Sequence, residues 1–142
     1  MKINIICIGT IKEKYFLEAI AEYKKRLSRF CTLNIIELQQ CKIDEPNISI
    51  KFEEEKIMEK LEGYIILMDI NGKQLSSPDL AKTLSKLEVN GNSTISFVIG
   101  GSFGVSQNIK DKANMRLSFS PMTFPHQLFR VMLLEQIYRA LP

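Results

Sequence analysis

The sequence predicts an α/β fold in which a mostly parallel sheet is covered by helices on both faces. Short apolar segments alternate along the chain with longer segments of helical, amphipathic spacing. The apolar segments carry few charged residues, as strands buried on both faces do. Glycine or a helix-capping residue follows several of them, which is typical of strand-to-helix turns. We therefore expect strands and helices in strict alternation, with parallel strand pairing.

The composition is that of one globular domain, which we place at residues 1–142. The 142 residues are 45% hydrophobic and 25% charged, which suits one hydrophobic core. No segment resembles a signal peptide or a membrane span, and the three cysteines lack Cys-x-x-Cys spacing. We therefore expect a cytoplasmic protein without a membrane contact or a metal site. The net charge of +3 only weakly favours an anionic partner.

The first half of the chain is predicted to form strands at residues 2–8, 32–38 and 64–69 and helices at residues 14–30 and 49–61. In the first helix, apolar residues recur every three or four positions and predict one buried face. Gly63 is expected to act as the C-cap of the second helix. A basic cluster in the first helix is either a solvated face or a phosphate-binding surface, and consists of Lys24, Lys25, Arg26 and Arg29.

In the second half, Ser76 and Pro78 predict a helix start. This favours a strand-to-helix connection over a hairpin at Asn71-Gly72. The remaining elements are predicted as a strand at residues 95–99, a helix at 107–113 with Ser106 as N-cap, a short strand near 116–120 and a helix at 126–140. The last helix has little polar surface, so it is either the central helix of the core or part of a subunit interface.

The segment Ile95–Gly104 is the feature around which we expect the chain to be organised. A buried strand enters a turn in which Gly100, Gly101 and Gly104 supply left-handed positions or positions without a Cβ atom. Ligands of parallel α/β sheets bind at such strand ends. The alternative is a tight turn with no ligand. Neither Gly-x-Gly-x-x-Gly nor a P-loop is present, so the common nucleotide-binding motifs are absent.

Longer motifs in the C-terminal half occur in a specific order: Ile99-Gly100-Gly101-Ser102-Phe103-Gly104, Leu117-Ser118-Phe119-Ser120, Met122-Thr123-Phe124-Pro125-His126-Gln127 and Glu135-Gln136-Ile137-Tyr138-Arg139-Ala140. With these motifs the sequence resembles the bacterial ribosomal RNA large subunit methyltransferase H family, whose members are small SPOUT-class enzymes. The resemblance extends to residues 2–9, 21–27 and 69–73, and so covers essentially the whole chain.

The resemblance implies an S-adenosylmethionine-dependent enzyme that methylates N3 of a pseudouridine in 23S rRNA of the assembled ribosome. It also implies a homodimer and a deep trefoil knot in the C-terminal part, which is a rare exception to the rules of chain connection. Carried over by position, the cofactor-binding residues are Met68, Gly100, Phe119, Ser120, Pro121, Met122, Thr123 and Phe124.

The proton-handling residue is less clearly indicated. His126 is the only histidine, and its imidazole could accept or relay the imide proton of the substrate. Alternatively, His126 starts a helix and hydrogen-bonds the neighbouring loop. Arg130 and Arg139 either bind phosphates or form ion pairs at the edge of the core.

This sequence differs from the family at its C-terminus. Family members continue to a tail ending in Tyr-His-Lys, whereas this sequence ends with Leu141-Pro142. From this difference we expect cofactor binding with impaired turnover. A non-catalytic, ribosome- or RNA-binding remnant that keeps the knotted dimer is the alternative hypothesis. A flavodoxin-like nucleotide-binding module is a third, and the poor phosphate-binding chemistry of the glycine turn argues against it.

Overall fold

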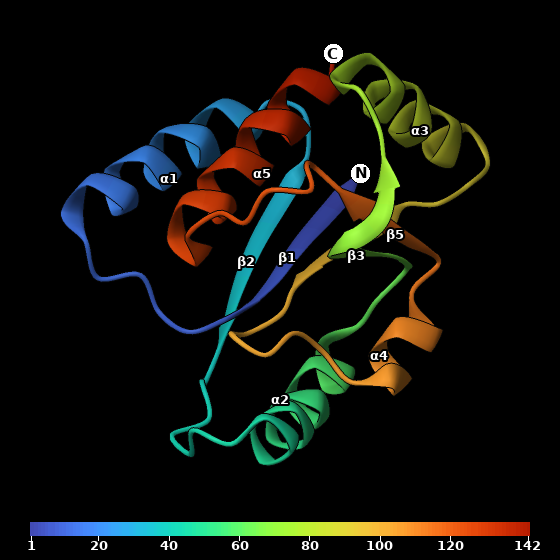
Figure 1. Cartoon of the computed structure of the whole chain (residues 1–142). Coiled ribbons are helices and arrows are strands. Elements are labelled where there is room, and N and C mark those ends of the chain that lie inside the picture. The colour runs from blue at the N-terminus through green and yellow to red at the C-terminus, as the bar shows by residue number, and fades with distance from the viewer.

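A computed structural model of residues 1–142 shows one five-stranded sheet between two layers of helices (Figure 1). The strand order is β2-β1-β4-β3-β5, and every pairing is parallel. The predicted α/β class and the alternation of elements are confirmed, whereas the knot stays a prediction. The elements are β1 (Lys2–Ile8), α1 (Lys14–Leu27), β2 (Thr32–Leu38), α2 (Pro46–Lys60), β3 (Tyr64–Gln74), α3 (Ser77–Val89), β4 (Thr94–Ile99), α4 (Gln107–Lys112), β5 (Met115–Ser118) and α5 (His126–Ala140).

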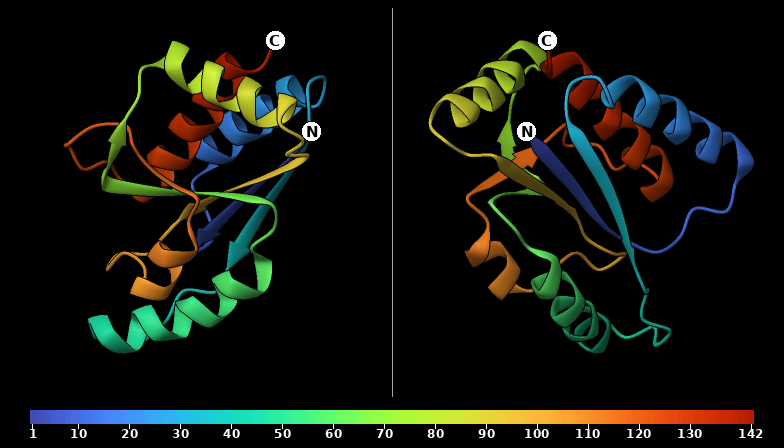
Figure 2. Two further views of the ribbon diagram at one scale, coloured as in Figure 1. Left: turned by 90° about the vertical axis from the view of Figure 1, so that its right-hand side faces the viewer. Right: turned by 180° about the vertical axis from the view of Figure 1, so that it is seen from behind.

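The helices cover both faces of the sheet unequally. Helices α1, α3 and α5 lie on one face, with α5 packed against both α1 and α3, while α2 and α4 cover the other face (Figure 2). Helix α5 is therefore the central helix of its layer within a single chain, which is one of the two roles that its apolar sequence predicts. No helix is both long enough and apolar enough to cross a membrane.

Alternation along the central strands explains why both faces are apolar. In β1, Ile3 and Ile5 pack in the core cluster beneath α5, whereas Ile6 and Ile8 pack in a second cluster that includes Ile57 of α2. The side chains of these four isoleucines are at most 4% exposed. Each such burial contributes about 1.5–3 kcal/mol relative to an exposed side chain. The isoleucine-rich sequence of β1 thus fits a strand with a helix layer on each side.

Helix α2 begins three residues before its predicted start. Pro46 occupies the first turn, and the Glu45 carboxylate accepts the Ile48 N–H at 2.7 Å, which caps the helix. Glutamate is not among the preferred N-cap residues, so this start carries no strong sequence signal. The other end also differs from expectation. Helix α2 ends at Lys60 with an extended Leu61 as C-cap, so Gly63 belongs to the turn into β3 and is not the cap.

Strand β3 runs past its predicted end at Asp69 and is interrupted. Met68 and Lys73 both pair with Leu117 of β5, so the residues between them leave the ladder. The strand can return to β5 because Gly72 has no side chain: a Cβ atom there would lie 2.7 Å from the main-chain oxygen of Arg116. The outward bend of residues 69–72 forms no hairpin, and it borders the cavity described next.

Candidate functional site

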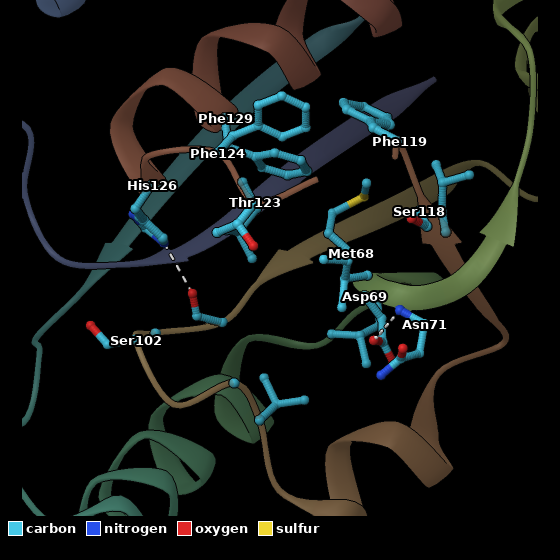
Figure 3. A pocket seen from close by; sticks show the side chains of 18 of the residues that line it. Met68, Asp69, Asn71, Ser102, Ser118, Phe119, Thr123, Phe124, His126 and Phe129 are labelled. Atoms are coloured by element: carbon cyan, nitrogen blue, oxygen red, sulfur yellow. Dashed lines mark hydrogen bonds between the residues drawn. The ribbon is translucent and has the colours of Figure 1, made fainter. Parts of the chain in front are cut away.

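A cavity of about 600 Å³ lies where β4 and β5 end, beside the bend in β3 (Figure 3). Small-molecule sites typically have this size and a mixed apolar and polar lining. Three segments that are distant in sequence form its walls, namely residues 67–71, 99–105 and 117–124 without Pro121. Lys110 of α4 and two residues of α5, His126 and Phe129, complete the lining. The cavity thus occupies the strand ends at which the sequence predicts a ligand.

Seven of the eight residues predicted to bind the cofactor line this cavity: Met68, Gly100, Phe119, Ser120, Met122, Thr123 and Phe124. Pro121 is not among the lining residues. The Ser120 hydroxyl accepts the Met122 N–H at 3.0 Å and closes a tight turn around Pro121. This turn leaves the proline ring exposed. That these residues, Pro121 included, bind the cofactor stays a prediction.

The glycine turn after β4 differs in detail from expectation. Only Gly104 has a positive φ, of 80°, and its N–H donates to the Gly101 carbonyl at 3.0 Å. A Cβ atom on Gly101 would lie 2.5 Å from the Glu53 carboxylate, and one on Gly100 would lie 2.7 Å from the Val105 side chain. These two glycines therefore accommodate neighbouring protein side chains, while their main chain borders the cavity.

Three phenylalanines form an aromatic wall of the cavity. The ring centroids of Phe119 and Phe129 are 5.1 Å apart, and those of Phe124 and Phe129 are 6.3 Å apart. Sequence reasoning missed Phe129, although it follows His126 by three residues and therefore lies on the same side of α5. Such a wall can hold a flat heterocycle and attract a cation to its ring faces.

Asp69 and Lys110 are the charged residues of the lining. One Asp69 oxygen accepts the Asn71 N–H at 3.0 Å, and the other lies 3.4 Å from an Arg116 nitrogen. These contacts fix the bend in β3. Lys110 is the only lysine or arginine among the lining residues. Sequence reasoning missed Lys110 because its helix, α4, is short and shows no sign of facing a ligand.

His126 links the start of α5 to the glycine turn after β4. Its Nε2 lies 3.0 Å from the Gly100 carbonyl oxygen (Figure 3), and because a carbonyl only accepts, Nε2 donates. Burial and the nearby Arg130 guanidinium lower the pKa of His126, and the hydrogen bond to Gly100 opposes them only in part. The ring is therefore neutral at pH 7, with Nδ1 free of this contact. This hydrogen bond is the loop-bonding role that sequence reasoning gave as one alternative.

The comparisons with known proteins agree with this arrangement. A family model described as "Predicted SPOUT methyltransferase" matches residues 1–142. The sequence is 50% identical over 151 residues to the ribosomal RNA large subunit methyltransferase H of Clostridium botulinum (strain Hall), with 99% of this chain and 93% of that protein covered. It is 52% identical over 149 residues to the protein of the same name from Clostridioides difficile (strain 630), with the same coverage. The chain belongs to the ribosomal RNA large subunit methyltransferase H family.

A solved structure agrees at the level of the fold. The SpoU methyltransferase AviRb from Streptomyces viridochromogenes, crystallised in complex with AdoMet, matches 97% of this chain and 57% of its own, with a TM-score of 0.50. Its sequence identity is only 9%, so this likeness concerns the architecture alone. The chain therefore has a SPOUT-type α/β fold.

In this methyltransferase H family member, Arg130 and Arg139 both form ion pairs. The Arg130 side chain is 1% exposed and binds the Glu37 carboxylate at 2.5 Å and the Gly9 carbonyl at 3.2 Å. Arg139 binds Glu135 at 2.6 Å on the surface of α5. Arg130 therefore joins α5 to the ends of β1 and β2.

Proposed function

We propose that this protein transfers a methyl group from S-adenosylmethionine to N3 of a pseudouridine in 23S rRNA of the assembled ribosome. The family membership supports the reaction class. The observation that carries the proposal is the cavity at the ends of β4 and β5, because it combines an aromatic wall with exposed main chain and few charges. The strand ends of α/β sheets are where such ligands bind.

The cavity fits the chemistry of this cofactor. A flat adenine suits the phenylalanine wall, and the positively charged sulfonium is attracted by aromatic ring faces. The Lys110 ammonium is the lining group suited to a carboxylate. Neutral polar side chains are available for the ribose hydroxyls and the amino group, and these are Asn71, Ser118, Ser120 and Thr123.

The reaction needs alignment and the removal of one proton. The bond from N3 to the methyl carbon forms as the bond from carbon to sulfur breaks, and the sulfur keeps the electron pair of that bond. The imide proton must leave N3 so that its electron pair can attack. A neutral His126 can accept this proton at Nδ1, since Nε2 is occupied by the Gly100 carbonyl. Holding the two reactants in line supplies much of the acceleration in such reactions.

Calorimetry with S-adenosylhomocysteine tests the cofactor site. Phe129→Ala removes the ring that neighbours both other phenylalanines, so we expect the affinity to fall about tenfold, which corresponds to about 1.4 kcal/mol. Leu128→Ala is the matched control, because Leu128 is 39% exposed and does not line the cavity. Equal affinities of Phe129→Ala and the wild type would argue against this cavity as the cofactor site.

The acceptor is tested by methyl incorporation into ribosomes that lack the modification. Methylation of N3 blocks the Watson–Crick edge, so primer extension on the product should stop at the modified base. Ribosomes with uridine in place of the pseudouridine serve as the comparison. Cofactor binding without methyl incorporation would favour the non-catalytic RNA-binding alternative. Incorporation at another base would refute the N3-pseudouridine assignment.

A homodimer is part of the proposal. A second cavity, of about 410 Å³ and mainly apolar, lies beside α5 and includes Val131 and Met132. Covering this groove by a second copy would bury the apolar surface that α5 leaves open. We expect a dimeric mass by light scattering, and a shift toward monomer in Met132→Lys.

RNA contact is expected from the basic cluster at the C-terminal end of α1 and in the turn after it. Arg26 pairs with Glu22 at 3.0 Å, whereas Lys24, Lys25 and Arg29 have no carboxylate partner and stay free for phosphates. With a net charge of only +3, we expect weak and salt-sensitive binding to naked rRNA. Filter binding at two salt concentrations measures this, and tight, salt-insensitive binding would contradict it.

A further inference from the structure

A smaller cavity of about 280 Å³ lies next to the proposed cofactor site, where β1 and β2 end. Residues Ile8, Gly9, Thr10, Gln40, Gly101, Ser102, His126, Gln127 and Arg130 line it. Gly101, Ser102 and His126 also line the larger cavity, so the two are neighbours across the glycine turn and one imidazole. Figure 3 shows Ser102 and His126 on the same side of the larger cavity.

The lining of the smaller cavity is polar, and most of its side chains have no partner in the chain. Ile8 is its only hydrophobic residue. The side chains of Thr10, Gln40, Ser102 and Gln127 make no hydrogen bond within the protein, so their donors and acceptors are available to a ligand. Amide and hydroxyl groups in this combination match a ring that carries both N–H and C=O groups.

The charge balance of the smaller cavity favours a neutral ligand over a phosphate. The Arg130 guanidinium is paired with the Glu37 carboxylate, so the lining offers no net positive charge. The Nε of Arg130 is nevertheless buried without a hydrogen-bond partner. A buried donor of this kind costs about 1–3 kcal/mol unless something accepts its hydrogen. Because this nitrogen is buried from the cavity as well, the pairing of Arg130 with Glu37 sets the charge that the lining presents to a ligand.

We infer that this smaller cavity takes the acceptor base as a pyrimidine with an imide edge, an inference that rests on the proposed methyl transfer. The base would present its imide nitrogen at the shared boundary, facing the cofactor. The volume is below the roughly 300–1,000 Å³ of drug-sized sites and suits a single ring. Thr10, Gln40 and Ser102 are exposed, so an unstacked base can enter from solvent.

Gln40 and Thr10 are the residues on which the inference is best tested, because neither lines the cofactor cavity. The Gln40 side-chain oxygen lies above Gly9, 3.7 Å from where a Cβ atom on Gly9 would stand. Thr10→Val and Gln40→Met keep the size of the side chains and remove their hydrogen-bonding groups. Gln39→Met is the matched control, since Gln39 is an exposed neighbour outside both cavities.

The first experiment measures ribosome methylation and cofactor binding in parallel. For the double variant Thr10→Val/Gln40→Met we expect kcat/KM to fall at least tenfold, while the affinity for S-adenosylhomocysteine stays within twofold of the wild type. Gln39→Met should match the wild type in both. A double variant with kcat/KM within twofold of the wild type would overturn the inference. So would a loss of cofactor affinity as large as the loss of kcat/KM, because the two residues would then act on the cofactor site.

The second experiment does not depend on turnover, so it separates this inference from the proposed function. Saturation-transfer NMR is recorded with millimolar uridine on protein saturated with S-adenosylhomocysteine. We expect ring-proton signals in the wild type and in Gln39→Met, and their loss in the double variant. The absence of a uridine signal in the wild type, or equal signals in the double variant, would overturn the inference even if ribosomes are methylated.

Discussion

Replacing Glu37 by leucine is expected to destabilise the fold more than replacing Arg130 by methionine, although the two residues form one ion pair. The Arg130 side chain is 1% exposed, whereas 35% of the Glu37 side chain is exposed. Without Glu37 the guanidinium stays buried with only the Gly9 carbonyl as acceptor, and stranding a buried charge costs about 3–5 kcal/mol. Without Arg130, the Glu37 carboxylate keeps the Ile11 N–H and can be hydrated, so we expect a loss of only about 1–2 kcal/mol.

Urea denaturation of the two single variants and the double variant measures these differences. At about 3 °C per kcal/mol for a chain of this size, the Glu37→Leu variant should also melt about 10 °C below the wild type. The double variant should lose less than the sum of the single losses, because removing both partners leaves no stranded charge. This account of the pair would be refuted if Arg130→Met were the more destabilising variant. It would also be refuted if the loss of unfolding free energy in the double variant equalled the sum of the two single losses.

Further predictions concern three other residues. Burial raises the pKa of the Cys7 thiol to about 11, so we expect a thiol reagent at pH 8 to modify Cys7 only after unfolding, and an adduct in the folded protein would contradict this. The pKa of His126 is lowered from 6.5, so its contribution to stability is present above pH 6.5 and lost as the pH falls through the folded-state pKa. Between pH 7 and pH 5, His126→Gln should lose less unfolding free energy than the wild type, and equal losses would exclude this linkage. Gly72→Ala should cost about 1–3 kcal/mol because its methyl group would press on β5, and a variant as stable as the wild type would show that β5 can shift.

The sequence predicted most of the fold because the strands are buried on both faces. The predicted ranges of β1, β2 and α5 agree with the structure, since apolar periodicity marks these elements directly. Helix α2 began earlier than predicted because its first turn rests on a proline and a carboxylate cap. The outward bend of β3 also escaped prediction, because it depends on how closely Gly72 can approach Arg116, which is 44 residues away in sequence.

The candidate site was predictable in part. The sequence indicated which segments form its walls, but not the directions in which their side chains point. The segments that form its walls are indicated by glycine, proline and the ends of apolar runs. Their relation to one another depends on the strand order, which places β3 between β4 and β5. Sequence spacing could not show that Gly100 and Gly101 face protein side chains. It also could not distinguish an Arg130 that binds phosphate from one that is buried in an ion pair.

The position of β4 at the centre of the sheet has a consequence for the synthesis of the chain. Strands β1 and β3 do not pair with each other, because β4 lies between them and is translated after both. Until residues 94–99 are available, the inner edges of β1 and β3 have no partners for their main-chain groups. Contacts of this long range delay folding and leave apolar strands open to aggregation. We therefore expect the nascent chain to remain without its central sheet, and in need of protection, until about two thirds of it has been made.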